Sequence, residues 1–177
     1  LGDGSYPFRE APARELTIDA FFLPPSLGYA AVEFIATPYG SLSLRTPVVT
    51  PSLVQAVASS IVHARDDYLA KKPVLEIVRV IDQAVSRWLD SSYPLRQLAE
   101  EALPAITGYS PAMIRQGIPA VLSAFREESL IQVLRSEMGD PLALDGFRPR
   151  GSAPGHTRAY GPRLTTHIFS GNIPAVP

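Results

Sequence analysis

The placement of proline constrains the fold of this chain more than any other feature of its sequence. Eighteen of the 177 residues are proline, and most lie where one predicted element ends and the next begins. Four of them lie at predicted helix starts: Pro51, Pro73, Pro94 and Pro111. The first and last follow Thr50 and Ser110, hydroxyl residues that can cap a helix whose first position is a proline. Prolines in these places predict separate helices and exclude one long helix.

Apolar residues recur every three or four positions after these starts, which is typical of helices with one apolar face. In the first helix this face comprises Leu53, Val54, Val57, Ile61, Ala64 and Tyr68. A fifth periodic segment ends at Gly139, a residue suited to the left-handed conformation that stops a helix. We therefore predict about five helices over residues 50–139, joined by short loops that favour antiparallel neighbours in a bundle-like layer. Pro119 lies inside the fourth and is expected to kink or split it.

Short strands are predicted on both sides of the helical region, where apolar and polar residues alternate. Residues 16–23 form one, and residues 31–35 and 42–45 form a hairpin around Thr37-Pro38-Tyr39-Gly40. Two more are predicted at residues 157–160 and 164–170, around the turn Gly161-Pro162. The predicted fold class is mainly α with short β elements. Its predicted parts are an N-terminal arm and β-hairpin (1–49), a helical region (50–139), a linker (140–156) and the first strands of a dinucleotide-binding domain (157–177).

The composition excludes several classes of function. The chain has 16 basic and 17 acidic residues, so it lacks the excess of basic residues that would indicate a nucleic-acid partner. It contains no cysteine, which excludes a thiolate metal site and a cysteine nucleophile within these residues. Its three histidines lack the spacing of metal ligands, and no metal site is predicted. No apolar run approaches the ~20 residues of a membrane span, and we expect a cytoplasmic protein.

The internal polar clusters favour structural roles. Adjacent carboxylates at Asp66-Asp67 and Glu127-Glu128 point to different sides of a helix, so a solvated surface is the favoured interpretation. His63 is interpreted as a packed or surface residue, and His167 as a hydrogen-bonded imidazole in a buried strand. The basic segment Arg148-Pro149-Arg150 is interpreted as a solvated loop, with contact to a CoA or nucleotide phosphate as the less favoured alternative.

The end of the sequence carries the strongest functional signal. The predicted strand at 164–170 runs into Gly171-Asn172-Ile173-Pro174. A buried strand that delivers a polar side chain to its carboxyl end is how a dinucleotide-type α/β domain can open. Asn172 is held stiffly because Pro174 restricts the residue before it, and its amide N–H can donate to an oxygen that gains negative charge. Taken alone, an asparagine in a turn is still the favoured interpretation. We expect this chain to be the front part of a larger protein whose catalytic machinery follows.

A series of motifs extends this signal over about 100 residues. They are Ile106-Thr107-Gly108-Tyr109-Ser110 with Met113, Leu130–Gly139, Phe147-Arg148-Pro149-Arg150-Gly151, Arg158-Ala159-Tyr160-Gly161-Pro162 and His167-Ile168-Phe169-Ser170-Gly171-Asn172-Ile173-Pro174. In order and spacing, the segment from about Ile77 to Pro177 resembles the acyl-CoA reductase family. The best-known member of that family is the fatty-acid reductase subunit of bacterial luminescence, and the family is related to the aldehyde dehydrogenases. Residues 1–50 match poorly.

The resemblance implies a reductase that converts an acyl-CoA to the aldehyde with NADPH through a cysteine thioester. It implies the N-terminal fragment of an α/β aldehyde dehydrogenase-like fold, inactive alone, with the cysteine and most of the NADPH site beyond Pro177. Asn172 matches the asparagine that stabilises the oxyanion in the related dehydrogenases, together with the backbone N–H of the nucleophile. The backbone of Phe169, Ser170 and Gly171 would then run beside the nicotinamide end of the cofactor.

The resemblance also sets the expected partners. They are an acyl-CoA or acyl-carrier substrate, the remainder of the chain itself and further copies in a homo-oligomer. A different class of function stays open from the residues alone, a non-catalytic helical protein-interaction module, because five amphipathic helices without cysteine or a metal cluster suit it. The two differ in their surfaces: part of an α/β enzyme should expose apolar side chains where its other domain docks, whereas a self-sufficient module should present polar helix faces.

Overall fold

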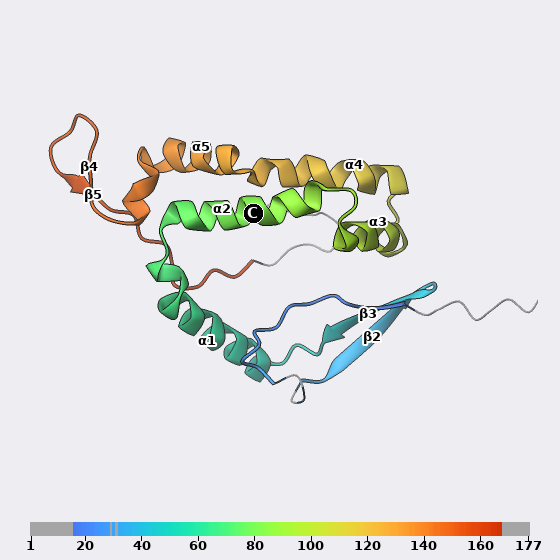
Figure 1. The fold of residues 1–177 in the computed structure, drawn as a ribbon. Helices are drawn as coiled ribbons and strands as arrows, with labels where there is room; N and C mark the ends of the chain where they lie inside the picture. Colours follow the sequence, from blue (N-terminus) through green and yellow to red (C-terminus); the bar gives the residue numbers. More distant parts are fainter. Residues whose placement is uncertain (1–15, 29, 31, 168–177) are drawn as a thin grey trace, which may run out of the picture.

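The computed structural model describes residues 16–28, 30 and 32–167, which form a small sheet, a group of helices and a short hairpin (Figure 1). The described chain is mainly helical, as the sequence predicts. The three strands of the sheet come first, five α-helices follow, and the hairpin lies after the last of them.

The sheet contains a hairpin where one was predicted, but its first strand lies at 34–39 and not 31–35, so Thr37, Pro38 and Tyr39 of the predicted turn belong to the strand. The sheet also has one pairing that the sequence did not predict. Strand β2 (Phe34–Tyr39) pairs antiparallel with β3 (Leu42–Pro47), and Tyr39 faces Leu42 across a two-residue loop. Gly40 in that loop has a φ of 65°, a left-handed conformation that glycine adopts without steric cost. Strand β1 (Leu16–Asp19), shorter than the predicted 16–23, pairs in parallel with the other side of β3. The strand order is therefore β1-β3-β2.

An arginine on the central strand contacts a side chain on each of the two outer strands. The guanidinium of Arg45 donates to both carboxylate oxygens of Asp19 on β1, with nitrogen–oxygen distances of 2.6 and 2.7 Å. The same guanidinium lies 5.0 Å from the ring centroid of Phe34 on β2. The hydrogen bonds from Arg45 hold the pKa of Asp19 below its ordinary value. This cluster is largely exposed, so it orients the strands more than it stabilises them.

Five α-helices occupy the predicted helical region. Their bounds are α1 (Pro51–Asp67), α2 (Val74–Leu89), α3 (Pro94–Thr107), α4 (Pro111–Leu122) and α5 (Glu127–Met138), with short 3₁₀ helices η2 (Leu69–Lys71), η3 (Ser123–Phe125) and η4 (Pro141–Leu144) between or after them. The predicted caps are confirmed: Thr50 Oγ1 accepts from the Leu53 N–H, and Ser110 Oγ accepts from the Met113 N–H, each at 3.2 Å. Gly139 ends α5 with a φ of 75°, as predicted.

Pro119 lies inside an unbroken helix, so the expected split does not occur, whereas the alternative of a kink stays a prediction. Helix α4 continues past Pro119 to Leu122, and the 3₁₀ helix η3 follows it directly. One proline removes a single backbone hydrogen bond, and the turn that follows it is still secured. The Ser123 hydroxyl donates to the Pro119 carbonyl at 2.6 Å, and the Ser123 N–H donates to the same oxygen.

Helices α2 to α5 pack against one another, with α2 lying alongside α4 and α5 (Figure 1). Their buried apolar side chains are Val74, Val78, Val85, Ala102 and Ile114. An acidic side chain locks α2 to the start of α5, since Asp82 Oδ1 accepts from the Glu127 N–H at 2.9 Å and from Arg126 Nε at 2.6 Å. These two donors, the backbone N–H above all, lower the pKa of Asp82.

Helix α1 stands apart from this group, and its apolar face is only partly covered. None of its residues is buried, Val54 and Ile61 are 54% and 43% exposed, and Tyr68, which follows directly after the helix, is 72% exposed. The periodicity predicted the helix correctly, but periodicity alone does not supply a partner for the apolar face. Exposed apolar side chains also occur on the other helices, for example Val80 on α2 and Val133 on α5, at 60% and 55%.

The C-terminal strands differ from the prediction. A two-residue strand β4 (Arg148–Pro149) pairs with β5 (His156–Thr157), and residues 158–167 form no strand. The predicted strands at 157–160 and 164–170 are therefore wrong for all their described residues except Thr157, and positions 168–170 lie outside the described residues. A buried strand needs neighbouring strands to take up its backbone hydrogen bonds, and the described chain offers none here. His167 is accordingly exposed, not a core imidazole.

Candidate functional site

The site residues predicted from the sequence lie beyond the part of the chain that the structure describes. Asn172, Phe169, Ser170 and Gly171 all fall within residues 168–177. Their proposed roles at an oxyanion and beside a nicotinamide therefore stay predictions. The candidate site that the described residues do form lies elsewhere, between helices α3 and α4.

This site is an apolar groove of about 690 Å³, called the α3–α4 groove below. Ala99 and Leu103 line it from α3, and Tyr109 lines it from the connection between the helices. The other wall is α4, which contributes Met113, Ile114, Gly117, Ile118, Val121 and Leu122. Trp88, near the end of α2, completes the lining. No lining residue is charged, and only the tryptophan and the tyrosine carry a side-chain N–H or O–H.

Helical spacing explains why these residues share a wall. Met113, Gly117 and Val121 are four residues apart, so they lie one above the other on the same face of α4. Gly117 keeps that face open, because a Cβ atom placed there would meet no atom within 4 Å. Ile114 is buried, whereas Met113 is 57% exposed and Tyr109 40%. The groove therefore has a buried side and an open side.

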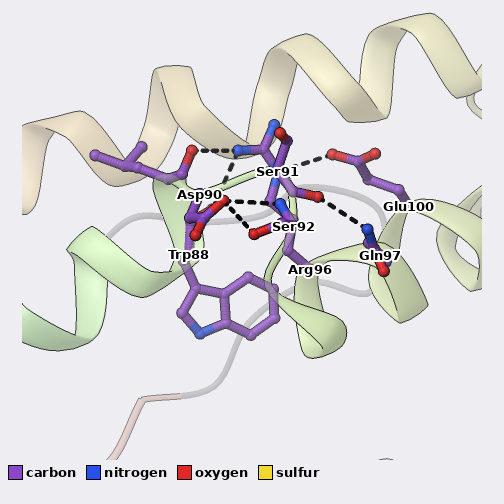
Figure 2. A network of polar contacts seen from close by, with 8 residues as sticks. Trp88, Asp90, Ser91, Ser92, Arg96, Gln97 and Glu100 are labelled. Carbon is purple, nitrogen blue, oxygen red and sulfur yellow. Dashed lines mark hydrogen bonds and ion pairs between the residues drawn. The ribbon is translucent and has the colours of Figure 1, made fainter.

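The corner between α2 and α3 holds the groove's tryptophan in place. Arg96, only 8% exposed, donates to the carbonyl oxygens of Leu89 at 2.6 Å and Trp88 at 3.3 Å, and to the Glu100 carboxylate at 2.8 Å. Figure 2 shows this network, with the Trp88 indole projecting away from it. The indole also meets the Tyr93 ring edge-on, with centroids 5.8 Å apart.

A second set of hydrogen bonds shapes the same corner. The Asp90 carboxylate accepts from the Ser92 N–H at 2.8 Å and from the Ser92 hydroxyl at 2.7 Å (Figure 2). These two donors hold the pKa of Asp90 below its ordinary value. The Gln97 side chain donates to the Ser91 carbonyl at 3.2 Å from the other side of the turn. The corner is thus held by hydrogen bonds among its own residues.

The other polar residues singled out in the sequence do not converge on a site. No group of three potential metal ligands occurs among the described residues. His63 is exposed on α1, 3.8 Å from Asp67. Arg148 lies 3.8 Å from Asp140, and Arg163 pairs with Asp66. Within residues 16–28, 30 and 32–167, no helix has both the length and the apolar character to cross a bilayer.

Sequence reasoning assigned most of the groove's residues to helix cores, one helix at a time. Periodicity places a residue on a face but does not show that two faces leave space between them. A signal was present, however, because Tyr109 and Met113 belong to the family-like segment around Ile106–Ser110. These two residues line the groove. Their presence in the lining favours a functional role for the groove more than its apolar character alone does.

Comparison with known proteins identifies one relationship. A family model described as acyl-CoA reductase (LuxC) matches residues 69–177, which is more than half of the chain and includes α2 to α5. No curated protein and no solved structure matches the chain.

Proposed function

This chain belongs to the acyl-CoA reductase (LuxC) family, and we propose on that premise that its protein reduces an acyl-CoA to the aldehyde with NADPH. The observation that carries the proposal is the family match, which covers both the α3–α4 groove and Asn172. The aldehyde dehydrogenase-like fold of the whole protein is part of the proposal.

The proposed reaction has two parts. A cysteine thiolate attacks the acyl carbonyl, CoA leaves as its thiolate, and the acyl group remains on the enzyme as a thioester. Reduction of that thioester releases the aldehyde and restores the cysteine thiolate. NADPH, when bound, supplies the hydride. The 177 residues contain no cysteine, so in this proposal the thiol belongs to sequence beyond Pro177.

In this proposal the chain's own contribution to the chemistry comes from Asn172. Both parts of the reaction place negative charge on the acyl oxygen, and a preorganised N–H donor stabilises that charge. The described residues contain no glycine-rich phosphate loop. By the family resemblance, the cofactor contacts are proposed for the backbone of Phe169, Ser170 and Gly171 and for residues beyond Pro177.

The test is NADPH oxidation with a panel of acyl-CoAs, run on this chain and on a version extended past Pro177 to the natural stop. We expect aldehyde formation in the extended protein only. Absence of turnover in both, with every chain length tried, would overturn the reductase proposal.

Asn172→Ala in the extended protein tests the oxyanion role. Loss of one such donor costs about 2.7–4 kcal/mol of transition-state stabilisation, or 10²–10³ in kcat. The KM for acyl-CoA and the circular dichroism spectrum should stay unchanged, since the donor acts only on the developing charge. Unchanged turnover in this variant would remove Asn172 from the mechanism.

The family match does not favour a non-catalytic interaction module. The exposed apolar side chains also disagree with that alternative, which requires polar helix faces toward solvent. On helices α2 and α5, Val80 and Val133 are 60% and 55% exposed.

A further inference from the structure

The α3–α4 groove has the character of a hydrocarbon-binding site. Its volume of about 690 Å³ lies within the range of small-molecule pockets, ~300–1,000 Å³. Its walls carry no charge, so a charged group inside it would lose its hydration without gaining a partner. A ligand that fits must therefore bury an uncharged chain and keep its polar end outside, at the open side beside Met113 and Tyr109.

We propose that the α3–α4 groove binds the hydrocarbon chain of the acyl donor. This inference rests on the proposed reductase function, because a family described as acyl-CoA reductases acts on a molecule that has one apolar chain and one highly charged end. The thioester and the CoA portion would lie outside the groove, in water or against residues beyond those described.

Three features suit the groove to a flexible chain. Met113, at the open side, has an unbranched and polarisable side chain that adapts to ligands of different shape. Gly117 leaves space along the middle of the α4 wall. Trp88 provides a flat apolar surface whose position is fixed by the Arg96 hydrogen bonds to the backbone of the same corner (Figure 2). A groove lined by both a fixed and an adaptable side chain lets hydrocarbon chains of different length bind in one place.

The chain carries its own reporter for this site, because Trp88 is its only tryptophan. The probes are decanoate, dodecanoate and tetradecanoate below their micelle concentrations, with free CoA as the negative control. We expect a saturable blue shift of the Trp88 emission with the fatty acids and none with CoA. Affinity should rise about fourfold for each methylene removed from water, until the groove is full.

Gly117→Leu tests whether the fatty acid occupies the groove. The new side chain starts from the groove wall in free space, and replacing a mid-helix glycine favours the helix, so the variant should fold. Gly161→Leu is the matched control, since this glycine is exposed, does not line the groove and also has no atom within 4 Å of a built Cβ. We expect at least tenfold weaker fatty-acid binding for Gly117→Leu and unchanged binding for the control.

With this chain, any of three results would overturn the inference: no response of Trp88 to any fatty acid, equal affinity in both variants, or a self-associated chain that Gly117→Leu dissociates. The last would show that a second copy covers the groove. In the extended protein, Gly117→Leu should lower kcat/KM for long acyl-CoAs at least tenfold more than for acetyl-CoA. Reductase activity that Gly117→Leu lowers equally for long acyl-CoAs and acetyl-CoA would refute the acyl-binding role of the groove but not the proposed function. Fatty-acid binding without reductase activity would refute the proposed function alone.

Discussion

Arg96 should be the most important polar residue for the stability of the helical group. In a regular helix the carbonyls of Trp88 and Leu89 would accept from the N–H groups four residues later, those of Ser92 and Tyr93. Both donors are used elsewhere, because the Ser92 N–H binds the Asp90 carboxylate and the Tyr93 N–H binds the Asp90 carbonyl. Arg96 Nη1 donates to the two carbonyls in their place.

The expected loss in the free energy of unfolding follows from the polar groups that Arg96→Met would leave without a donor. Methionine keeps most of the apolar stem but leaves two carbonyls and the Glu100 carboxylate without this donor. The side chains of Arg96 and Glu100 are 9% and 19% exposed, so neither group is fully rehydrated in the variant. Removal of one partner from a buried pair costs ~3–5 kcal/mol, and with some residual exposure we expect a loss of about 3 kcal/mol in the free energy of unfolding.

Urea unfolding followed by circular dichroism would measure this loss. Arg115→Met is the control, because Arg115 is exposed on α4, and it should change stability by less than about 0.5 kcal/mol. Adding Glu100→Leu to Arg96→Met removes the unpaired carboxylate and should recover about 1 kcal/mol or more. Arg96→Met within 1 kcal/mol of the wild type would refute the reasoning and would mean that water satisfies the corner equally well.

Two smaller effects are expected elsewhere in the fold. Thr50→Ala should lower the free energy of unfolding by about 1 kcal/mol by removing the acceptor for the Leu53 N–H, while Thr50→Ser should be nearly neutral; equal stability of the two variants by urea unfolding would contradict the capping role. The pKa of Asp82 is lowered from its ordinary 3.8, first by the Glu127 N–H, so its stabilisation is complete above pH 3.8 and is lost as the pH falls through the folded-state pKa. Unfolding measured from pH 7 to acid should therefore show that Asp82→Asn is less stable than the wild type at neutral pH. The difference in the free energy of unfolding should disappear in acid, and a difference independent of pH would refute this.

Local signals in the sequence predicted much of the fold. A cap, a proline or a glycine acts on the neighbouring turn, so Thr50, Ser110 and Gly139 marked helix ends correctly. Pairings between distant segments were harder, because alternation shows that a strand has two faces but not which strand lies beside it. The parallel β1–β3 pairing was therefore missed, and strands were assigned at 157–160 and 164–170 where the described chain supplies no neighbours.

The functional residues also differ in how far the sequence could predict them. Asn172 and its neighbours came from a motif in residues that the structure does not describe, and their roles stay predictions. The groove could not be predicted from periodicity, because a face lined with Leu103, Ile118 and Val121 has the same pattern whether it meets another helix closely or leaves a space. Only the packing of α3 against α4 shows the space.

The family-like segment at the connection of α3 and α4 also positions part of the groove lining. Gly108, with a φ of 75°, ends α3 in the left-handed conformation, and Ser110 caps the first turn of α4 two residues later. At the end of α3 the Thr107 hydroxyl donates to the Leu103 carbonyl at 2.7 Å and accepts from the Tyr109 N–H at 3.2 Å. This short connection sets the position of α4 relative to α3 and brings Tyr109 to the groove. A segment that carries the sequence resemblance to the family thus also contributes Tyr109 and, with the Met113 that follows, part of the lining of the proposed acyl site. Substitutions in it should therefore alter preference for acyl chain length before they alter the chemical step.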